Sequence, residues 1–208
     1  MSLHLRYMSA ADVKPVVAID HQAFDLPWTP ESYLYEVRES THTYMVVLDF
    51  EQEQAPLLPW WRRLLGLHNG HHAHHDIAGY GGLWKIQSEA HISTIATHPD
   101  YRGRGWGEIL LASMVRRAIF LEASYVILEV RVSNTVAQNL YTKYGFVTRR
   151  VVEKYYRNNN EDAYEMELLL TPQAIEEFEA RFAALLARHP FVDDYTTTPH
   201  PRSQRYLA

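Results

Sequence analysis

The sequence of 208 residues contains no cysteine. The absence of thiols excludes disulfide bonds, a cysteine nucleophile and zinc sites built on cysteine. The sequence also lacks a run of about 18 apolar residues, the length that a membrane-spanning helix needs. Its first residues lack the apolar centre of a signal peptide. We therefore expect a cytoplasmic protein without a membrane span.

An excess of positive charge is absent as well. The 20 Lys and Arg residues are outnumbered by 25 Asp and Glu, which leaves a formal net charge of −5. Proteins that bind nucleic acids usually present a basic face, so we expect no direct nucleic-acid partner. The composition, 47% hydrophobic and 22% charged, is that of an ordinary globular protein.

Hydrophobic periodicity predicts an α/β fold with a mixed sheet. Strands are expected at 3–7, 43–49, 77–84, 90–97, 125–130, from 146 and at 163–170, and helices at 10–20, 30–37, 108–122, 134–144 and 172–188. We expect a domain over residues 1–170 and, over 171–208, a C-terminal helix followed by a loose tail after Pro190. The helix either packs on the domain or forms the face of a homodimer.

Residues 50–76 are expected to be an insertion between two early strands, because they exceed the usual length of a hairpin loop. Within them, residues 60–65 (Trp-Trp-Arg-Arg-Leu-Leu) either fold back as a small helix or touch a membrane surface or partner. Residues 71–75 contain four histidines. Imidazoles bind Zn²⁺ or Ni²⁺, but the sequence shows no carboxylate triad and no fixed second shell of ligands, so we expect a solvated loop and no metal.

A glycine-rich stretch, Arg102-Gly103-Arg104-Gly105-Trp106-Gly107, follows a predicted strand and precedes a predicted helix. Such a loop points free N–H groups at one spot, where the helix dipole adds positive charge. This predicts a socket for a phosphate or pyrophosphate. The spacing matches neither the dinucleotide nor the P-loop motif, and an ordinary strand–helix turn is the alternative.

Four blocks together resemble the GCN5-related N-acetyltransferase (GNAT) family and, within it, the ribosomal-protein-alanine N-acetyltransferase (RimI) type. The blocks are Phe24-x-x-Pro27-Trp28-Thr29, the stretch from Ile95 to Gly107, Leu128-Glu129-Val130-Arg131-x-Ser133-Asn134, and Leu140-Tyr141-x-x-Tyr144-Gly145-Phe146 followed by Tyr155-Tyr156. The resemblance spans residues 3–170 outside the insertion. It implies a central, mostly antiparallel, twisted mixed sheet flanked by helices, here with an extra C-terminal helix.

The resemblance also implies acetyl-CoA as co-substrate and a protein or peptide N-terminus, such as that of a ribosomal protein, as acceptor. Glu129 matches the family's base and Tyr141 its acid. The positions that match the acetyl-CoA site are Ile95, Ala96, Thr97, Arg102, Gly103, Arg104, Gly105, Trp106, Gly107, Glu108, Asn134 and Tyr141. Those that match the acceptor slot are Phe24, Leu26, Pro27, Trp28, Tyr155 and Tyr156.

The chemistry of these side chains agrees with the implied roles. An α-amino group has a pKa of about 8, so a base has to remove only one proton from it before it attacks the thioester. A phenol, with a pKa of about 10, can protonate the leaving thiolate, whose conjugate thiol has a pKa of about 8.5. Structural roles are the alternatives: a paired carboxylate for Glu129, core packing for Tyr141, a contact that joins the two N-terminal helices for Trp28, and surface packing for the tyrosine pair. Acetylation of a small amine or a lysine, or non-catalytic acyl-CoA binding, are the other functions that the sequence leaves open.

Overall fold

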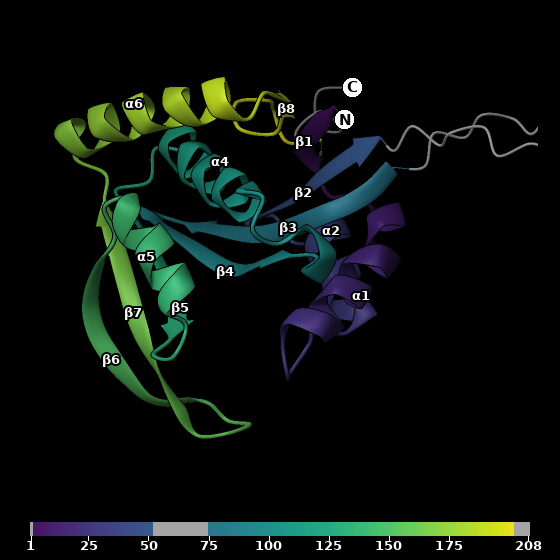
Figure 1. The fold of residues 1–208 in the computed structure, drawn as a ribbon, viewed down its shortest axis with the longest axis horizontal. Coiled ribbons are helices and arrows are strands. Elements are labelled where there is room, and N and C mark those ends of the chain that lie inside the picture. The colour runs from purple at the N-terminus through teal and green to yellow at the C-terminus, as the bar shows by residue number, and fades with distance from the viewer. Residues whose placement is uncertain (1, 52–74, 202–208) are drawn as a thin grey trace, which may run out of the picture.

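The computed structural model describes residues 2–51 and 75–201, and its centre is a mixed sheet (Figure 1). The strands in spatial order are β6-β7-β5-β4-β3-β2-β1-β8. Only β4–β5 and β1–β8 pair in parallel within the described residues. The strands are β1 (Leu3–Tyr7), β2 (Thr43–Glu51), β3 (His75–Ile86), β4 (Glu89–Thr97), β5 (Tyr125–Arg131), β6 (Val147–Tyr156), β7 (Glu161–Leu169) and β8 (Phe191–Asp194). The predicted α/β class and mostly antiparallel mixed sheet are confirmed.

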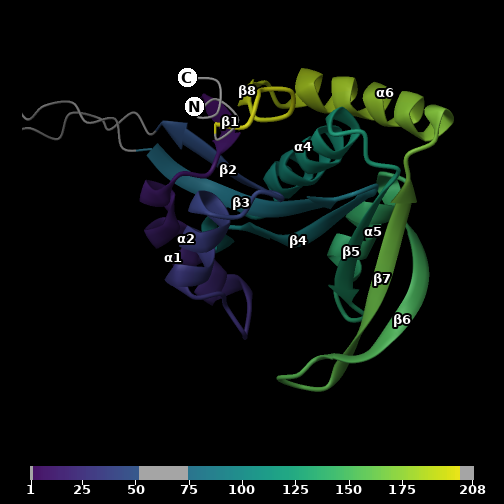
Figure 2. The same cartoon turned by 180° about the vertical axis from the view of Figure 1, so that it is seen from behind.

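Helices cover both faces of this sheet, as the two opposite views show (Figures 1 and 2). The described helices are α1 (Val13–Ala23), α2 (Pro30–Arg38), α4 (Trp106–Phe120), α5 (Thr135–Lys143) and α6 (Pro172–Arg188), with short 3-10 turns η1 (Ala10–Asp12) and η2 (Pro99–Tyr101). Two of the predicted starts are confirmed by their caps. The hydroxyl of Thr29 accepts from Ser32 N–H at 3.2 Å, and that of Thr171 accepts from Ala174 N–H at 3.2 Å.

Strand β2 shows how the sequence builds the two layers. Its side chains alternate between faces, as a strand requires. Met45 and Val47 pack with α1 and α2, whereas Val46 and Leu48 pack with α4 on the other face. All four are buried. The centre of the sheet is therefore covered on both sides.

The C-terminal segment differs from the expectation of a loose tail. Strand β8 pairs in parallel with β1, and Tyr195 is fully buried. The guanidinium of Arg117, buried on α4, donates to the carbonyl of Thr198 at 2.8 Å. A buried cation needs acceptors, and main-chain carbonyls supply them whatever the local composition is. The predicted loose tail is therefore wrong for residues 191–201.

Two further boundaries differ from the prediction. Strands β2 and β3 extend to Glu51 and back to His75, so they take up both ends of the expected insertion. Residues 52–74, with the segment 60–65 and histidines 71, 72 and 74, lie outside the described residues. Helix α4 begins two residues early, because Gly105 is its N-cap. In residues 2–51 and 75–201, no helix is long and apolar enough to cross a membrane.

Candidate active site

The centre of the sheet opens where β4 and β5 separate. These parallel strands pair only through Glu89–His91 of β4 and Tyr125–Ile127 of β5. Beyond that point they diverge (Figure 1), and a cavity of about 350 Å³ lies between them. Its walls come from β4, β5, the end of α1, the α1–α2 loop, α5 and the end of β6. Where the strands do not pair, their facing backbone groups are available to a ligand.

The glycine-rich loop lies between η2 and the N-terminus of α4. Gly103 and Gly105 have φ values of +75° and +81°, a conformation that favours glycine. The first N–H groups of a helix have no intrahelical acceptor, so those of Trp106 and Gly107 face outward from its start. The N–H of Glu108 instead donates to the carbonyl of Gly105 at 3.1 Å. The N–H of Glu108 therefore already has an acceptor, so Trp106 and Gly107 are the residues of this first turn whose N–H groups remain for a phosphate.

The side chain of Glu108 ties the loop to two other helices. Its Oε1 accepts from Lys143 Nζ at 2.6 Å, from the Tyr144 hydroxyl at 2.8 Å and from Arg188 Nη2 at 3.0 Å. Burial alone would raise the pKa of Glu108, but the hydrogen bonds from Lys143 and Tyr144 outweigh it and lower the pKa. The C-terminal end of α6 is thereby held beside the first turn of α4.

Glu129 lies on β5, at the edge of the cavity, and is paired with a histidine. The Nε2 atom of His91 on β4 is 2.8 Å from Glu129 Oε2. The two side chains are 20% and 14% exposed, so the pair is close to solvent but not immersed in it. Trp84 packs its ring edge-on against the His91 ring, with centroids 5.5 Å apart. No local motif in the sequence marks His91 as a partner of Glu129, which lies 38 residues further along the chain.

Tyr141 and Asn134, both on or next to α5, also line the cavity. Tyr141 is only 6% exposed, and burial raises the pKa of its phenol. The side-chain oxygen of Asn134 accepts from Ala137 N–H at 3.1 Å and caps α5. Asn134 is therefore a helix cap as well as a lining residue, and its oxygen is already bonded.

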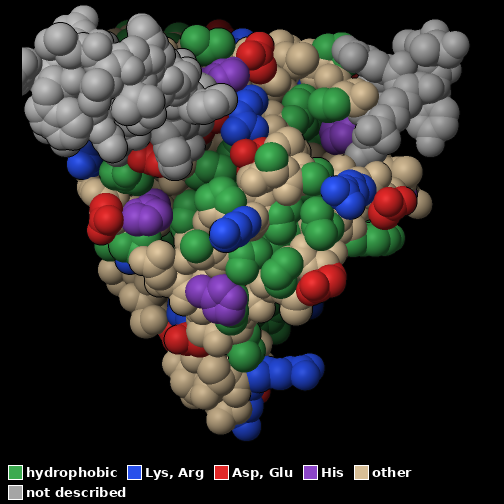
Figure 3. Space-filling view, turned by 90° about the vertical axis from the view of Figure 1, so that its right-hand side faces the viewer, with side chains coloured by type: hydrophobic (Ala, Val, Ile, Leu, Met, Phe, Trp, Pro, Cys, Tyr) green, Lys and Arg blue, Asp and Glu red, His purple; other side chains and the backbone are tan. Residues whose placement is uncertain are grey.

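Two walls rich in aromatic side chains line the cavity. Phe24, Leu26 and Trp28 come from the α1–α2 segment, and Tyr155 and Tyr156 from the end of β6. Burial and the nearby Glu129 carboxylate raise the pKa of Tyr155 to about 12. Hydrophobic side chains also gather in the middle of the face that α1 and α2 form, with acidic and basic groups interspersed around them (Figure 3).

A buried polar cluster holds the α1–α2 wall in place. Asp20 on α1 accepts from Trp28 N–H at 2.6 Å and from the Tyr80 hydroxyl, which in turn accepts from the Tyr33 hydroxyl at 3.1 Å. The Trp28 ring lies 5.3 Å from that of Tyr33 and 6.2 Å from that of Trp84. Trp28 therefore packs α2 against β3 and also lines the cavity. Asp20 lines the cavity too, and no sequence motif identified it.

Most of the side chains that were predicted to act in catalysis or in acceptor binding line one cavity. The glycine-rich loop, residues 102–107, does not line it. The predicted residues that line the cavity are Ile95, Glu129, Asn134, Tyr141, Phe24, Leu26, Trp28, Tyr155 and Tyr156. Pro27 and Ala96 are not among the lining residues. Ala96 is buried on the α1 and α2 side of the sheet. The glycine-rich loop follows the end of β4, where Arg102 Nε donates to the carbonyl of Thr97 at 3.4 Å.

Comparison with known proteins agrees with this arrangement. The model of the acetyltransferase (GNAT) family matches residues 22–146. A provisionally named ribosomal protein bS18-alanine N-acetyltransferase from Bacillus subtilis is 33% identical over 159 residues, which cover 76% of this chain and 90% of the relative. This similarity confirms the predicted resemblance to the ribosomal-protein-alanine type.

Solved structures show the same fold. The ribosomal-protein-S18-alanine N-acetyltransferase from Escherichia coli has a TM-score of 0.63 at 22% identity, covering 81% of this chain and 94% of that one. A chain of the NatC complex bound to Gag peptide and CoA has a TM-score of 0.63 at 18% identity, covering 82% and 100%. With a family model that spans more than half of its length, this chain belongs to the GNAT acetyltransferase family and is an N-acetyltransferase.

Proposed function

We propose that the enzyme transfers the acetyl group of acetyl-CoA to the α-amino group of a protein N-terminus. One observation carries this proposal: Glu129 and Tyr141 line the same cavity, where β4 and β5 separate, and Glu129 is also paired with His91. A carboxylate can remove a proton from the amine and a phenol can protonate the leaving sulfur, which are the two proton transfers that acyl transfer to an amine requires.

The residues present fit acetyl-CoA. The separated edges of β4 and β5 offer backbone donors and acceptors to an amide-containing arm such as pantetheine. The N–H groups from Gly103 to Gly107 are suited to a pyrophosphate at the start of α4. A Cβ at Gly105 would lie 2.9 Å from His189 Nε2 and would have to displace the imidazole, and the φ of +81° also favours glycine here. Acetyl-CoA supplies the activated thioester.

Glu129 is suited to prepare the acceptor. An incoming N-terminus is mostly an ammonium near neutral pH, and it becomes a nucleophile only when it has lost a proton. Glu129 takes this proton, and the hydrogen bond at 2.8 Å lets His91 receive it and release it to water.

Tyr141 is suited to complete the transfer. The amine nitrogen forms a bond to the acetyl carbon, the carbon–sulfur bond breaks, and the sulfur leaves as a thiolate. Tyr141 keeps its proton because burial raises the pKa of its phenol, and it can donate that proton to the sulfur. The nitrogen loses its second proton to solvent as the amide forms, and the Tyr141 phenolate regains a proton from solvent. The products are an amide, CoA and one proton released to water.

The acceptor class rests on the walls and on the relatives. Phe24, Leu26 and Trp28 on one side, with Tyr155 and Tyr156 on the other, line the cavity, and we expect the slot between them to take an extended chain end with a small first residue. Relatives named as ribosomal-protein-alanine N-acetyltransferases make a ribosomal protein with an N-terminal alanine the expected acceptor, met in the cytoplasm.

A matched pair of peptides tests the proposal. One begins with a free alanine and contains no lysine; the other has a blocked N-terminus and one internal lysine. We expect CoA release with the first. Glu129→Gln should lower kcat by about 10²–10⁴-fold, the range for a general base, without changing the Kd for acetyl-CoA. Activity on the blocked peptide alone would refute the N-terminal assignment, and wild-type kcat in Glu129→Gln would remove Glu129 as the base.

A further inference from the structure

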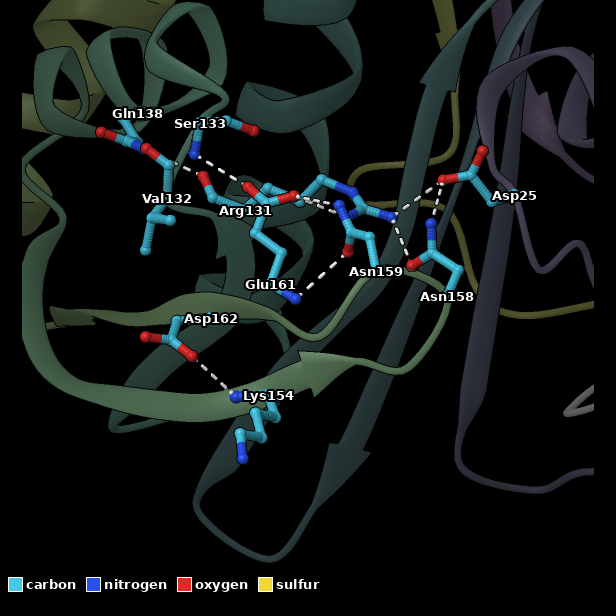
Figure 4. Close-up of polar contacts among 10 residues, drawn as sticks. All are labelled: Asp25, Arg131, Val132, Ser133, Gln138, Lys154, Asn158, Asn159, Glu161 and Asp162. Atoms are coloured by element: carbon cyan, nitrogen blue, oxygen red, sulfur yellow. Dashed lines mark hydrogen bonds and ion pairs between the residues drawn. The ribbon is translucent and has the colours of Figure 1, made fainter.

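Arg131, at the end of β5, joins the two walls of the cavity. Its Nη2 donates to Asp25 Oδ2 at 3.0 Å in the α1–α2 loop and to Asn158 Oδ1 at 3.1 Å in the β6–β7 turn. Asn158 Nδ2 also donates to Asp25 Oδ2, at 2.7 Å. Figure 4 shows Asp25 and Asn158 together at one end of the guanidinium. Three residues from three separate segments thus form one closed set of hydrogen bonds.

The other end of Arg131 is held firmly. Nη1 donates to Glu161 Oε2 at 2.7 Å, and the guanidinium carbon lies 3.9 Å from the centre of the Tyr156 ring. Hydrogen bonds from Ser133 and Arg131 lower the pKa of Glu161 to about 2, so Glu161 stays ionised. The Arg131 side chain is therefore held in place by Glu161 and Tyr156. Asp25 and Asn158 bind its other, solvent-facing nitrogen.

The attachment on that side is weaker. Asp25 is 64% exposed, whereas Arg131 is 24% exposed and lines the cavity. Exposed ion pairs are weak and are screened by salt. The contact between Asp25 and Asn158 can therefore open without disturbing the Arg131–Glu161 pair. Because Leu26 follows Asp25 in one wall and Tyr156 precedes Asn158 in the other, opening this contact would widen the slot between the walls.

We propose that the Asp25–Arg131–Asn158 contact, here called the bridge, is a specificity element that restricts acceptors to flexible chain ends. This inference rests on the proposed function. A chain end enters the slot as one extended strand and fits between walls that the bridge holds close. An internal lysine carries backbone on both sides of its side chain and needs a wider entrance. The bridge therefore disfavours lysine more than an N-terminus.

The test compares the two peptides described above, with acetylation measured by mass spectrometry. Asp25→Asn should raise the rate on the lysine peptide, relative to the alanine peptide, by about two- to fivefold, the range for an exposed ion pair. Adding Asn158→Ala should raise it further. Raising NaCl from about 50 to 500 mM should increase this ratio in the wild type but not in Asp25→Asn. The Kd for CoA should not change.

Glu31→Gln is the matched control, because it removes one exposed acidic charge near the same loop without touching the bridge. It should leave the ratio unchanged. If the double variant Asp25→Asn with Asn158→Ala keeps the wild-type ratio of lysine-peptide rate to alanine-peptide rate, the bridge is not a specificity element, whatever the salt dependence of that ratio. If instead the wild type acetylates no peptide with a free N-terminus, the proposed function fails, which is a separate result.

Discussion

His91 Nε2 and Glu129 Oε2 lie 2.8 Å apart, at the point where the parallel pairing of β4 and β5 ends. His91 pairs with Ile127, and Glu129 is two residues further along β5, so Ile127 and Glu129 project from the same face. The register therefore brings the imidazole against the carboxylate. Where the strands separate, Glu129 lines the cavity, whereas His91 is not among its lining residues.

We predict that His91→Gln lowers kcat by about tenfold, less than the loss expected for a direct base, because the amide keeps a hydrogen bond to Glu129 but cannot take its proton. The Kd for acetyl-CoA should stay at the wild-type value. In His91→Ala, added imidazole should restore part of kcat, whereas a bulkier buffer base should not. Stopped-flow or steady-state CoA release measures both effects. Wild-type turnover in His91→Ala would mean that the pairing is structural.

Replacing Tyr141 by Phe should lower kcat by about 10²-fold, because the thiolate then leaves without a positioned proton donor. The KM for the peptide should change little. Since burial raises the pKa of this phenol, Tyr141 remains protonated as pH rises through the usual tyrosine range. The pH profile of kcat should therefore show no alkaline loss from Tyr141 below about pH 10. Tyr35→Phe is the control, because it removes an exposed hydroxyl on α2 from a residue that does not line the cavity.

Gly105→Ala should weaken acetyl-CoA binding by about tenfold. The residue has a φ of +81°, and an added Cβ would lie 2.9 Å from His189 Nε2. A non-glycine residue in this region costs about 1–2 kcal/mol, which the loop can avoid only by moving its N–H groups. Isothermal titration with CoA measures the change. The double variant with His189→Ala relieves the collision but not the backbone strain, so it should recover only part of the affinity.

Arg117→Met should destabilise the C-terminal segment. The guanidinium donates to the carbonyls of Tyr195, Thr196 and Thr198 at 3.3, 3.4 and 2.8 Å. Without it, buried carbonyls lose their donor at a cost of about 2 kcal/mol in the free energy of unfolding. Urea unfolding should show this loss, and limited proteolysis should cut residues 190–201 faster. Arg116→Met, which removes a half-exposed neighbour paired to Glu179 at 3.5 Å, should have a much smaller effect.

Local signals in the sequence determined the elements of this protein and the blocks from which its family could be identified. Alternation in β2, the Thr-Pro caps of α2 and α6, and the glycine-rich start of α4 each act over a few residues, so they can be read without knowing the fold. Residues such as Glu129 and Tyr141 could be selected because they stand inside recognisable blocks. The structure confirms these elements and brings both side chains to one cavity.

Only the tertiary structure decided which distant residues meet. The His91–Glu129 pair depends on strand register across 38 positions, and the Asp25–Arg131 contact spans 106. The attachment of residues 191–201 depends on main-chain carbonyls that meet Arg117, and these carry no residue signature. Hydrogen bonds between separate segments form only when packing has set their distance. Local composition therefore could not reveal the partner of Glu129, the bridge between the two walls or the ordered C-terminal strand.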